Sequence, residues 1–98
     1  MTDAVTIEMP ESFDFQEVKD FSEQVNTHIH NQVSRIVLDF GKVTYIDSTG
    51  LGMLAIAQKT AHGANCEILL ENLTPQARDV FKLASFDRLF DGLELNHD

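Results

Sequence analysis

The chain has 98 residues, and 7 Lys and Arg against 16 Asp and Glu give it a net charge of −9 with neutral histidines. That length predicts a single domain over residues 1–98 with one modest hydrophobic core. Binding to a phosphate backbone requires clustered Lys and Arg, so we expect no nucleic-acid partner. A lone cysteine, Cys66, and an N-terminus without a signal-peptide pattern predict a cytoplasmic protein. No apolar stretch is long enough for membrane insertion.

The first third of the chain predicts a strand and then a helix. Residues 5–9 alternate apolar and polar side chains, the pattern of a half-buried strand, and Pro10 ends it. Asp14 and Glu17 have the spacing of a capping box, which predicts that a helix of about four turns starts there. Its expected apolar stripe consists of Phe15, Val18, Phe21, Val25 and Ile29.

The middle of the chain predicts a second strand and a second helix. Residues 35–40 contain a continuous apolar run rich in β-branched side chains, which indicates a strand covered on both faces. Val43 and Ile46 are expected to anchor the loop that follows. We expect the second helix to start at Asp47 or Ser48 and to run to about residue 60, with His62-Gly63 ending it.

The last third predicts one more strand and helix. Residues 66–70 have the composition of a strand. Thr74-Pro75 is a typical helix start, with Thr as the cap and Pro in the first turn. The face of this helix is expected to hold Ala77, Val80, Phe81 and Ala84. A last strand is expected around residues 93–95. The alternation of strands and helices predicts an α/β sheet with parallel crossovers.

The run from Asp47 to Gly52, Asp-Ser-Thr-Gly-Leu-Gly, is the distinctive motif of the chain. It stands where a loop enters a helix, so its polar side chains can accept hydrogen bonds from the free amides of the first turn. Its two glycines let another backbone or a protein surface approach closely. A structural cap and a binding site are both consistent with this pattern, since an exposed serine at a helix N-terminus is also a good place for a phosphate.

The helix after the motif is unusually apolar for a helix that lies on a sheet. A single stripe with Leu51, Leu54 and Ala55 suffices to cover the sheet, which leaves Met53, Ile56 or Ala57 partly exposed. An apolar patch beside an exposed serine is typical of a docking surface. Burial of this helix on two sides explains the same composition, and the sequence leaves both interpretations open.

The motif, with residues 36–40 before it and the anchors Val43 and Ile46, resembles the STAS domain family of anti-sigma factor antagonists. The resemblance covers about residues 5–95. It implies an α/β fold with a mixed four- to five-stranded sheet, parallel crossovers and helices packed mainly on one face. Two features depart from the family pattern. The chain has room for one strand where many members have an N-terminal hairpin, and Ser85-Phe86 stands where Gly-Leu is common.

The resemblance also implies a function in bacterial signal transduction and transcription regulation. Members bind an anti-sigma factor, often a serine kinase, and thereby free sigma; phosphorylation by the partner prevents this binding, and a metal-dependent serine phosphatase restores it. Ser48 corresponds to the phosphorylated serine, with Thr49 as the less favoured position. The implied partner-binding residues are Asp47, Ser48, Thr49, Gly50, Leu51, Gly52, Met53 and Ile56. The resemblance implies a binding module that is no enzyme. We expect no cofactor or metal, and the acidic charge together with the apolar helix face predicts a monomer or weak dimer.

A second function within the same family is a subunit of a lipid-transport ATPase. In that case the apolar helix is a permanent docking face, and Ser48 is never phosphorylated. Ser48→Asp separates these possibilities, because it should abolish phosphorylation-switched binding while leaving the thermal melt nearly unchanged. A large loss of stability would instead indicate that Ser48 is a structural cap.

Enzymatic alternatives fit the sequence poorly. The nucleophile elbow of serine hydrolases requires glycine two residues on either side of the serine, whereas Ser48 has Ile46 before it and Gly50 after it. The chain's potential general bases are His28, His30, His62 and His97, and none has a recognisable setting. No Lys follows the glycines as a phosphate-binding loop requires.

Metal binding is equally weakly indicated. His28 and His30 are two residues apart on a predicted helix and do not face each other. His62 and Cys66 lie four residues apart across a turn, but a structural zinc site needs two further ligands. We therefore interpret these histidines as surface residues and Cys66 as a small core residue.

Overall fold

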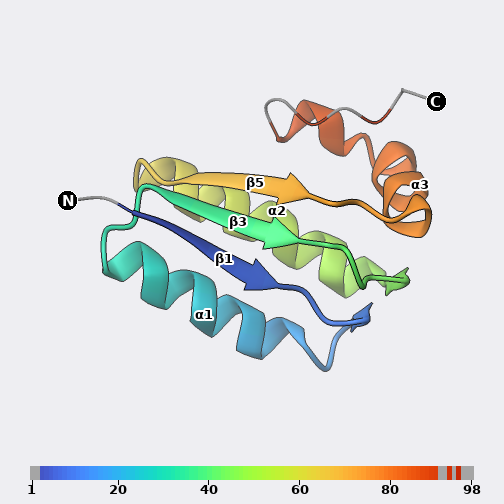
Figure 1. The fold of residues 1–98 in the computed structure, drawn as a ribbon, viewed down its shortest axis with the longest axis horizontal. Coiled ribbons are helices and arrows are strands. Elements are labelled where there is room, and N and C mark those ends of the chain that lie inside the picture. Colours follow the sequence, from blue (N-terminus) through green and yellow to red (C-terminus); the bar gives the residue numbers. More distant parts are fainter. Residues whose placement is uncertain (1–2, 91–92, 94, 96–98) are drawn as a thin grey trace.

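The computed structural model describes residues 3–90 together with 93 and 95. In chain order, its elements are β1 (Ala4–Glu8), β2 (Ser12–Phe13), α1 (Val18–His30), β3 (Arg35–Asp39), β4 (Tyr45–Ile46), α2 (Ser48–Gly63), β5 (Glu67–Glu71), α3 (Pro75–Leu83) and the 3₁₀ helix η1 (Phe86–Arg88). Strands and helices alternate along most of the chain, which confirms the predicted α/β class (Figure 1).

The strands form two parallel sheets. The larger sheet has three strands in the order β1-β3-β5, and the smaller one pairs β2 with β4. The small sheet lies beyond the carboxyl ends of β1 and β3 (Figure 1). The expectation of a mixed sheet of four to five strands is wrong in one respect: the five strands pair in parallel and form two sheets. Each strand of the small sheet is two residues long, and pairing over two residues holds β2 and β4 together without extending the main sheet.

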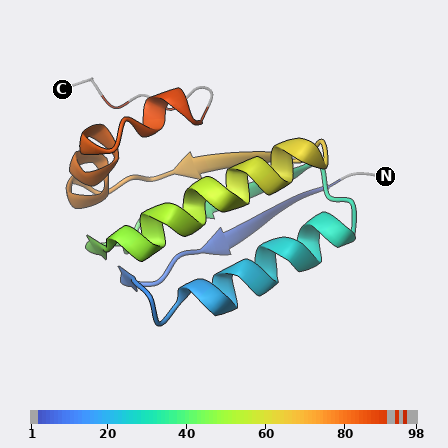
Figure 2. The same cartoon turned by 180° about the vertical axis from the view of Figure 1, so that it is seen from behind.

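Helices α1 and α2 lie side by side on one face of the three-stranded sheet (Figures 1 and 2). Ile36 and Leu38 of β3 are completely buried, whereas Val37, on the opposite face of the strand, is only half-buried. The prediction that this strand is covered on both faces is wrong for the described residues, because α1 and α2 lie on one face and Val37 on the other stays half-buried. An Arg35–Glu67 ion pair of 2.9 Å crosses the open face.

Helix α3 and η1 pack beside the carboxyl end of β5 (Figure 1). A chain of aromatic contacts connects them to the sheet, with ring centroids 5.4 Å apart for Phe40 and Phe81 and 5.1 Å apart for Phe81 and Phe86. Thr74 caps α3 as predicted. Ala84 is exposed because the helix ends before it, so its predicted place on the buried face is wrong.

Helix α1 begins at Val18, later than the capping-box pattern predicted. The reason is that Asp14 caps a turn: its Oδ1 accepts the N–H of Gln16 at 3.0 Å. Phe15 consequently lies in that turn and is not part of the apolar stripe of α1. At the other end of the chain, the predicted strand at 93–95 includes residue 94, which lies outside the described residues.

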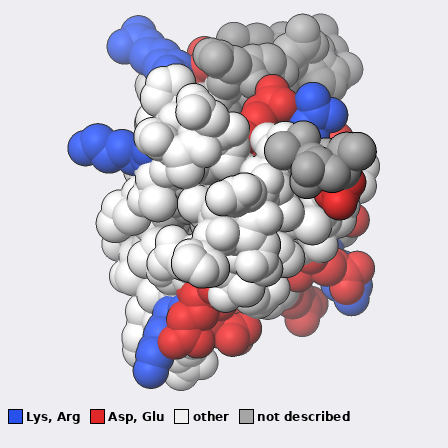
Figure 3. Space-filling view, turned by 90° about the vertical axis from the view of Figure 1, so that its left-hand side faces the viewer, with Lys and Arg blue, Asp and Glu red and all other residues white. Residues whose placement is uncertain are grey.

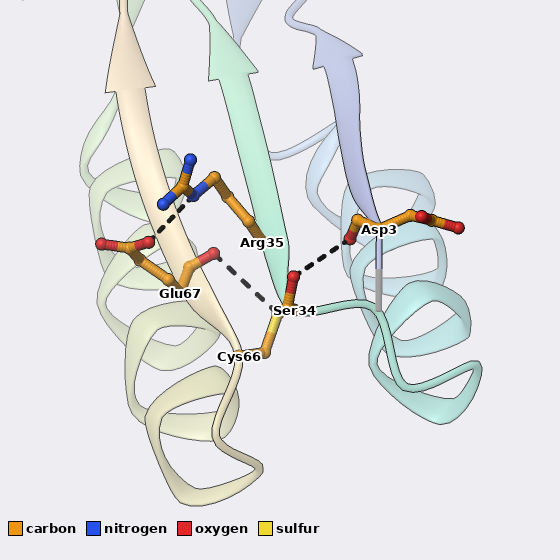
Figure 4. Close-up of polar contacts among 5 residues, drawn as sticks. All are labelled: Asp3, Ser34, Arg35, Cys66 and Glu67. Atoms are coloured by element: carbon orange, nitrogen blue, oxygen red, sulfur yellow. Dashed lines mark hydrogen bonds and ion pairs between the residues drawn. The ribbon is translucent and has the colours of Figure 1, made fainter. Parts of the chain in front are cut away.

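The amino ends of the three main strands are joined by hydrogen bonds. Figure 4 shows two of the side-chain contacts there: the Ser34 hydroxyl donates to the Asp3 carbonyl at 3.4 Å, and Arg35 pairs with Glu67 at 2.9 Å. The backbone N–H of Ser34 donates to the carbonyl of Asp3 at 3.1 Å, and the N–H of Glu67 donates to the carbonyl of Ser34 at 2.9 Å. This end of the sheet is therefore fixed independently of the helix-start motif at the opposite end. Within the described residues, no helix is both long enough and apolar enough to cross a membrane.

Candidate functional site

Asp47 organises the start of α2. It is the N-cap residue, and its Oδ1 accepts the N–H of Gly50 at 2.8 Å. Its Oδ2 accepts the N–H of Phe15 at 3.1 Å, and its own N–H donates to the Phe13 carbonyl at 3.3 Å. One carboxylate thus joins the helix N-terminus to the turn between β2 and α1.

Ser48 is the first residue of α2 and is exposed. Because Asp47 is the cap, the Ser48 hydroxyl is not needed to satisfy the first turn. Among the described residues, this hydroxyl has no hydrogen-bond partner. Thr49 is exposed as well. The motif therefore contains both a structural cap, which is Asp47, and an exposed serine, Ser48, that is available at the surface.

The two glycines of the motif have different environments. A Cβ on Gly50 would lie 2.5 Å from the Phe13 carbonyl oxygen and 3.2 Å from Cγ2 of Ile46, whereas a Cβ on Gly52 would meet no atom within 4 Å. Gly50 is buried and Gly52 is exposed. Gly50 can therefore shape a recognition surface only indirectly, by allowing β2 to pack against the helix start, whereas Gly52 is exposed and faces open space.

The apolar residues of α2 divide between core and surface. Leu54 and Ala57 are buried, Leu51 and Met53 are half-buried against the core, and Ile56 is 58% exposed. Three residues of this helix were candidates for exposure. Ile56 is exposed and Met53 is partly exposed, whereas Ala57 is buried, so the expectation for Ala57 is wrong. Ile56 follows Gly52 by four residues and so lies one turn along the same exposed face.

Two exposed aromatic residues stand close to Asp47 in the chain or in space, and sequence reasoning assigned neither to a site. Phe15 is 65% exposed and Tyr45 is 56% exposed. Phe15 was misplaced because its spacing to Val18 fits a helical stripe. Phe13, two residues earlier, is completely buried and takes the place in the core that the pattern predicts for Phe15.

The end of the molecule opposite Ser48 carries the weaker candidate residues. A hollow of about 340 Å³ there is lined in part by Ser34, His62 and Cys66. The centre of this end is uncharged, and Asp and Glu gather along the lower and right-hand margins of the view (Figure 3). Burial raises the pKa of the Cys66 thiol, which disfavours a reactive thiolate. His97 lies outside the described residues, and the described ones contain no group of three or more His, Cys, Asp or Glu that could hold a metal ion.

Asp39 lies at the carboxyl end of β3, the same end of the sheet as the motif. Its carboxylate accepts hydrogen bonds from the Gly41 backbone N–H at 2.9 Å and the Asn72 side chain at 3.2 Å. These bonds favour the ionised form and lower its pKa below the ordinary value. Asp39 therefore fixes the turns after β3 and β5, which makes it structural.

Comparisons with known proteins converge on one family. A family described as "Mlab, STAS domain" matches residues 2–93. A STAS-domain containing protein of Pseudomonas aeruginosa is 34% identical over 86 residues, which cover 88% of this chain and 84% of that protein. BtrV of Bordetella bronchiseptica, whose name assigns it provisionally to the anti-sigma factor antagonists, is 33% identical over 73 residues, covering 70% of this chain and 63% of BtrV.

Solved structures show the same fold. The anti-sigma factor antagonist SpoIIAA in its unphosphorylated form matches with a TM-score of 0.78 and 21% identity, covering 92% of this chain and 79% of SpoIIAA. The phosphorylated form of SpoIIAA matches with a TM-score of 0.71. A sulfate transporter family protein from Wolinella succinogenes matches with a TM-score of 0.79 and 18% identity, covering 87% of this chain and 69% of that protein. At these identities the likeness concerns the fold.

Proposed function

Since the chain belongs to the STAS domain family, we propose that it is an anti-sigma factor antagonist whose binding is switched by phosphorylation of Ser48. In its unphosphorylated form it sequesters an anti-sigma factor, often a serine kinase, and so frees sigma. A metal-dependent serine phosphatase restores this form. The proposed role is that of a non-enzymatic binding module acting in the cytoplasm, where sigma factors work.

The observation that carries the proposal is the division of roles between Asp47 and Ser48. Asp47 caps α2 through Oδ1 and accepts the N–H of Phe15 through Oδ2. The Ser48 hydroxyl is exposed and has no hydrogen-bond partner among the described residues. A kinase can therefore modify Ser48 without breaking a hydrogen bond that the fold needs. The names of BtrV and SpoIIAA, and the two phosphorylation forms in which SpoIIAA was solved, support the same function.

The effect of a phosphate follows from electrostatics. It adds about −1.5 to −2 charges at pH 7 to a surface that already holds Asp47. Any partner that covers Ser48 must then desolvate this charge, which is costly unless the partner supplies a matching cation. The switch thus acts on binding and requires no change of fold. In this proposal the partner-binding surface consists of Ser48 and the neighbouring residues Thr49, Leu51, Gly52, Met53 and Ile56. The buried Gly50 contributes indirectly, because it lets β2 pack against the start of α2.

The test uses purified chain and the serine-kinase anti-sigma factors encoded in the same genome. We expect ATP-dependent phosphorylation at Ser48, located by mass spectrometry, and none in Ser48→Ala. Ser48→Asp should lose binding, whereas Thr60→Asp, with the same added charge about three turns along α2, should retain it. Both variants should melt close to wild type. Retained binding by Ser48→Asp would refute the switch.

A second candidate function, docking on a lipid-transport ATPase without phosphorylation, is favoured by one observation. Ile56 is 58% exposed on the same helix as Ser48, as expected of a permanent apolar contact. It predicts that Ile56→Asp abolishes binding to the ATPase and that Ser48→Asp does not. Binding of the wild type to such an ATPase and to no anti-sigma factor would replace the first function with this one.

A further inference from the structure

Phe15 is exposed for a structural reason. Its turn is fixed by three hydrogen bonds: the N–H of Gln16 donates to Asp14 Oδ1 at 3.0 Å, the N–H of Glu17 to the Asp14 carbonyl at 2.9 Å, and the N–H of Phe15 to Asp47 Oδ2 at 3.1 Å. Burial of an aromatic ring is among the larger stabilising contributions in a protein. Here an ordered turn instead holds the ring at the surface, with 65% of the residue exposed.

The position of Phe15 ties it to the proposed switch. Asp47 bonds the Phe15 backbone through one oxygen and caps the helix that begins with Ser48 through the other. A second exposed aromatic, Tyr45, stands two residues before Asp47 in β4. Aromatic side chains are the commonest strong anchors in protein interfaces. A phosphate on Ser48 and an aromatic anchor at residue 15 would therefore belong to one surface.

The charges near this surface indicate the chemistry of its partner. The segments that build it, residues 10–18 and 43–53, contain four acidic residues and no Lys or Arg, and two lysines, Lys19 and Lys42, directly flank them, so the local charge is net acidic. A pocket of about 380 Å³ between β1 and α1 adjoins the Phe15 turn and includes Phe13 and Glu17 in its lining. The lining also has buried apolar side chains, such as Met9. Lys42 lines the pocket as well, but it pairs with Glu8 at 3.1 Å, which leaves the carboxylates of Glu17 and Asp20 without that cation. This combination suits the aliphatic stem and charged head of a Lys or Arg side chain.

We propose that Phe15 is the apolar anchor of the docking surface around Ser48. The partner it fits has an apolar hollow for the ring, bordered by Lys or Arg side chains that meet Glu17 and Asp20. This inference rests on the proposed function and specifies the surface of the anti-sigma factor that the chain binds. In this proposal the basic side chains meet Glu17 and Asp20 of α1 and none meets Ser48, so a phosphate on Ser48 finds no matching cation and still prevents binding.

Leu83 provides a matched control for Phe15. It is 90% exposed, but it ends α3 and has no connection with Asp47. The probe is a purified anti-sigma factor from the same genome that binds the wild-type chain, and Kd is measured by isothermal titration calorimetry for wild type, Phe15→Ala and Leu83→Ala. We expect Phe15→Ala to raise Kd about tenfold or more and Leu83→Ala to leave it unchanged. Both variants should melt like wild type, because both side chains are exposed.

The outcomes separate this inference from the proposed function. If the wild type binds no anti-sigma factor, the proposed function fails. If the wild type binds and Phe15→Ala binds within about twofold of it, the anchor is wrong while the function stands. Should Phe15→Ala fold poorly, a photo-crosslinking phenylalanine at residue 15 or 83 decides: a cross-link to the anti-sigma factor from residue 15 alone supports the anchor, and none from residue 15 overturns it.

The basic rim of the partner has its own readout. Glu17→Gln should slow association and reduce its dependence on salt, because rim charges act mainly on the rate of encounter. Lys59→Gln, on the exposed part of α2, is the control and should not slow association. Association rates of the wild type that do not change between low and high salt would refute a basic rim.

Discussion

Replacing Gly50 with alanine tests how tightly the helix start is packed against β2. The new Cβ would lie 2.5 Å from the Phe13 carbonyl oxygen and 2.9 Å from Cδ2 of the Phe13 ring. The favourable separation of non-bonded carbon atoms is about 3.5–4.0 Å. One of the two contacts is with backbone, so a side-chain rotation cannot relieve it, and β2 or the first turn of α2 must move.

Gly52→Ala in the same helix supplies the reference for the magnitude. Alanine is favoured over glycine in a helix by about 1 kcal/mol, and this gain applies to both variants. A Cβ at residue 52 would meet no atom within 4 Å, so Gly52→Ala should be at least as stable as wild type. The difference between the two variants therefore isolates the steric cost, which for an added methyl group in a packed core is about 1–3 kcal/mol.

We expect the upper end of that range, because the clash is with a carbonyl group of the backbone. A difference of about 3 kcal/mol corresponds to a gap in Tm of about 12 °C or more for a domain of this size. Urea and thermal unfolding followed by circular dichroism measure it directly. If the two variants unfold within about 0.5 kcal/mol of each other, β2 moves freely, and the rigid placement of Asp47 and Phe15 is refuted.

Three further changes have expected outcomes. Thr74→Ala should cost about 1 kcal/mol of stability in urea unfolding, since its hydroxyl caps α3, and Thr74→Ser should recover most of it. The Gly41 N–H and the Asn72 amide stabilise the ionised Asp39 carboxyl, so its pKa should lie below 3.8 when it is measured by NMR. Its contribution to stability is complete above the pKa of the unfolded chain and is lost as pH falls through the pKa of the folded protein. A pKa at or above 3.8 would contradict these hydrogen bonds. Cys66 should react slowly with a thiol reagent at pH 8 in the folded protein and rapidly in urea, and equal rates would show that the thiol is accessible in the folded state.

Several elements were predictable from local signals alone. The Thr74-Pro75 start of α3 and the Asp47 start of α2 follow from cap chemistry, which acts within four residues of the chain. The motif at residues 47–52, together with residues 36–40 and the anchors Val43 and Ile46, also indicated the family, because its glycines and polar residues stand at fixed spacing from the strand before them.

Other features depended on contacts between distant residues. Phe13 and Phe15 have similar local surroundings, and the sequence pattern favoured Phe15 for the core of α1. The hydrogen bond from Phe15 to Asp47 and the pairing of β2 with β4 reversed that order, leaving Phe13 buried and Phe15 at the surface. Both interactions join residues more than thirty positions apart, so no local pattern contains them.

By itself, then, the sequence determined the alternation of strands and helices and the start of a helix at Ser48. The reason is that the spacing of apolar residues and the chemistry of helix caps both depend on residues close together in the chain. Only the tertiary structure decided that Asp47 also binds the turn at Phe15, that Gly50 is a packing residue and Gly52 an open one, and that α1 and α2 lie on one face of the main sheet. Each of these depends on which backbone lies within a few ångströms of a side chain, and that is set when β2, β4 and α2 pack together.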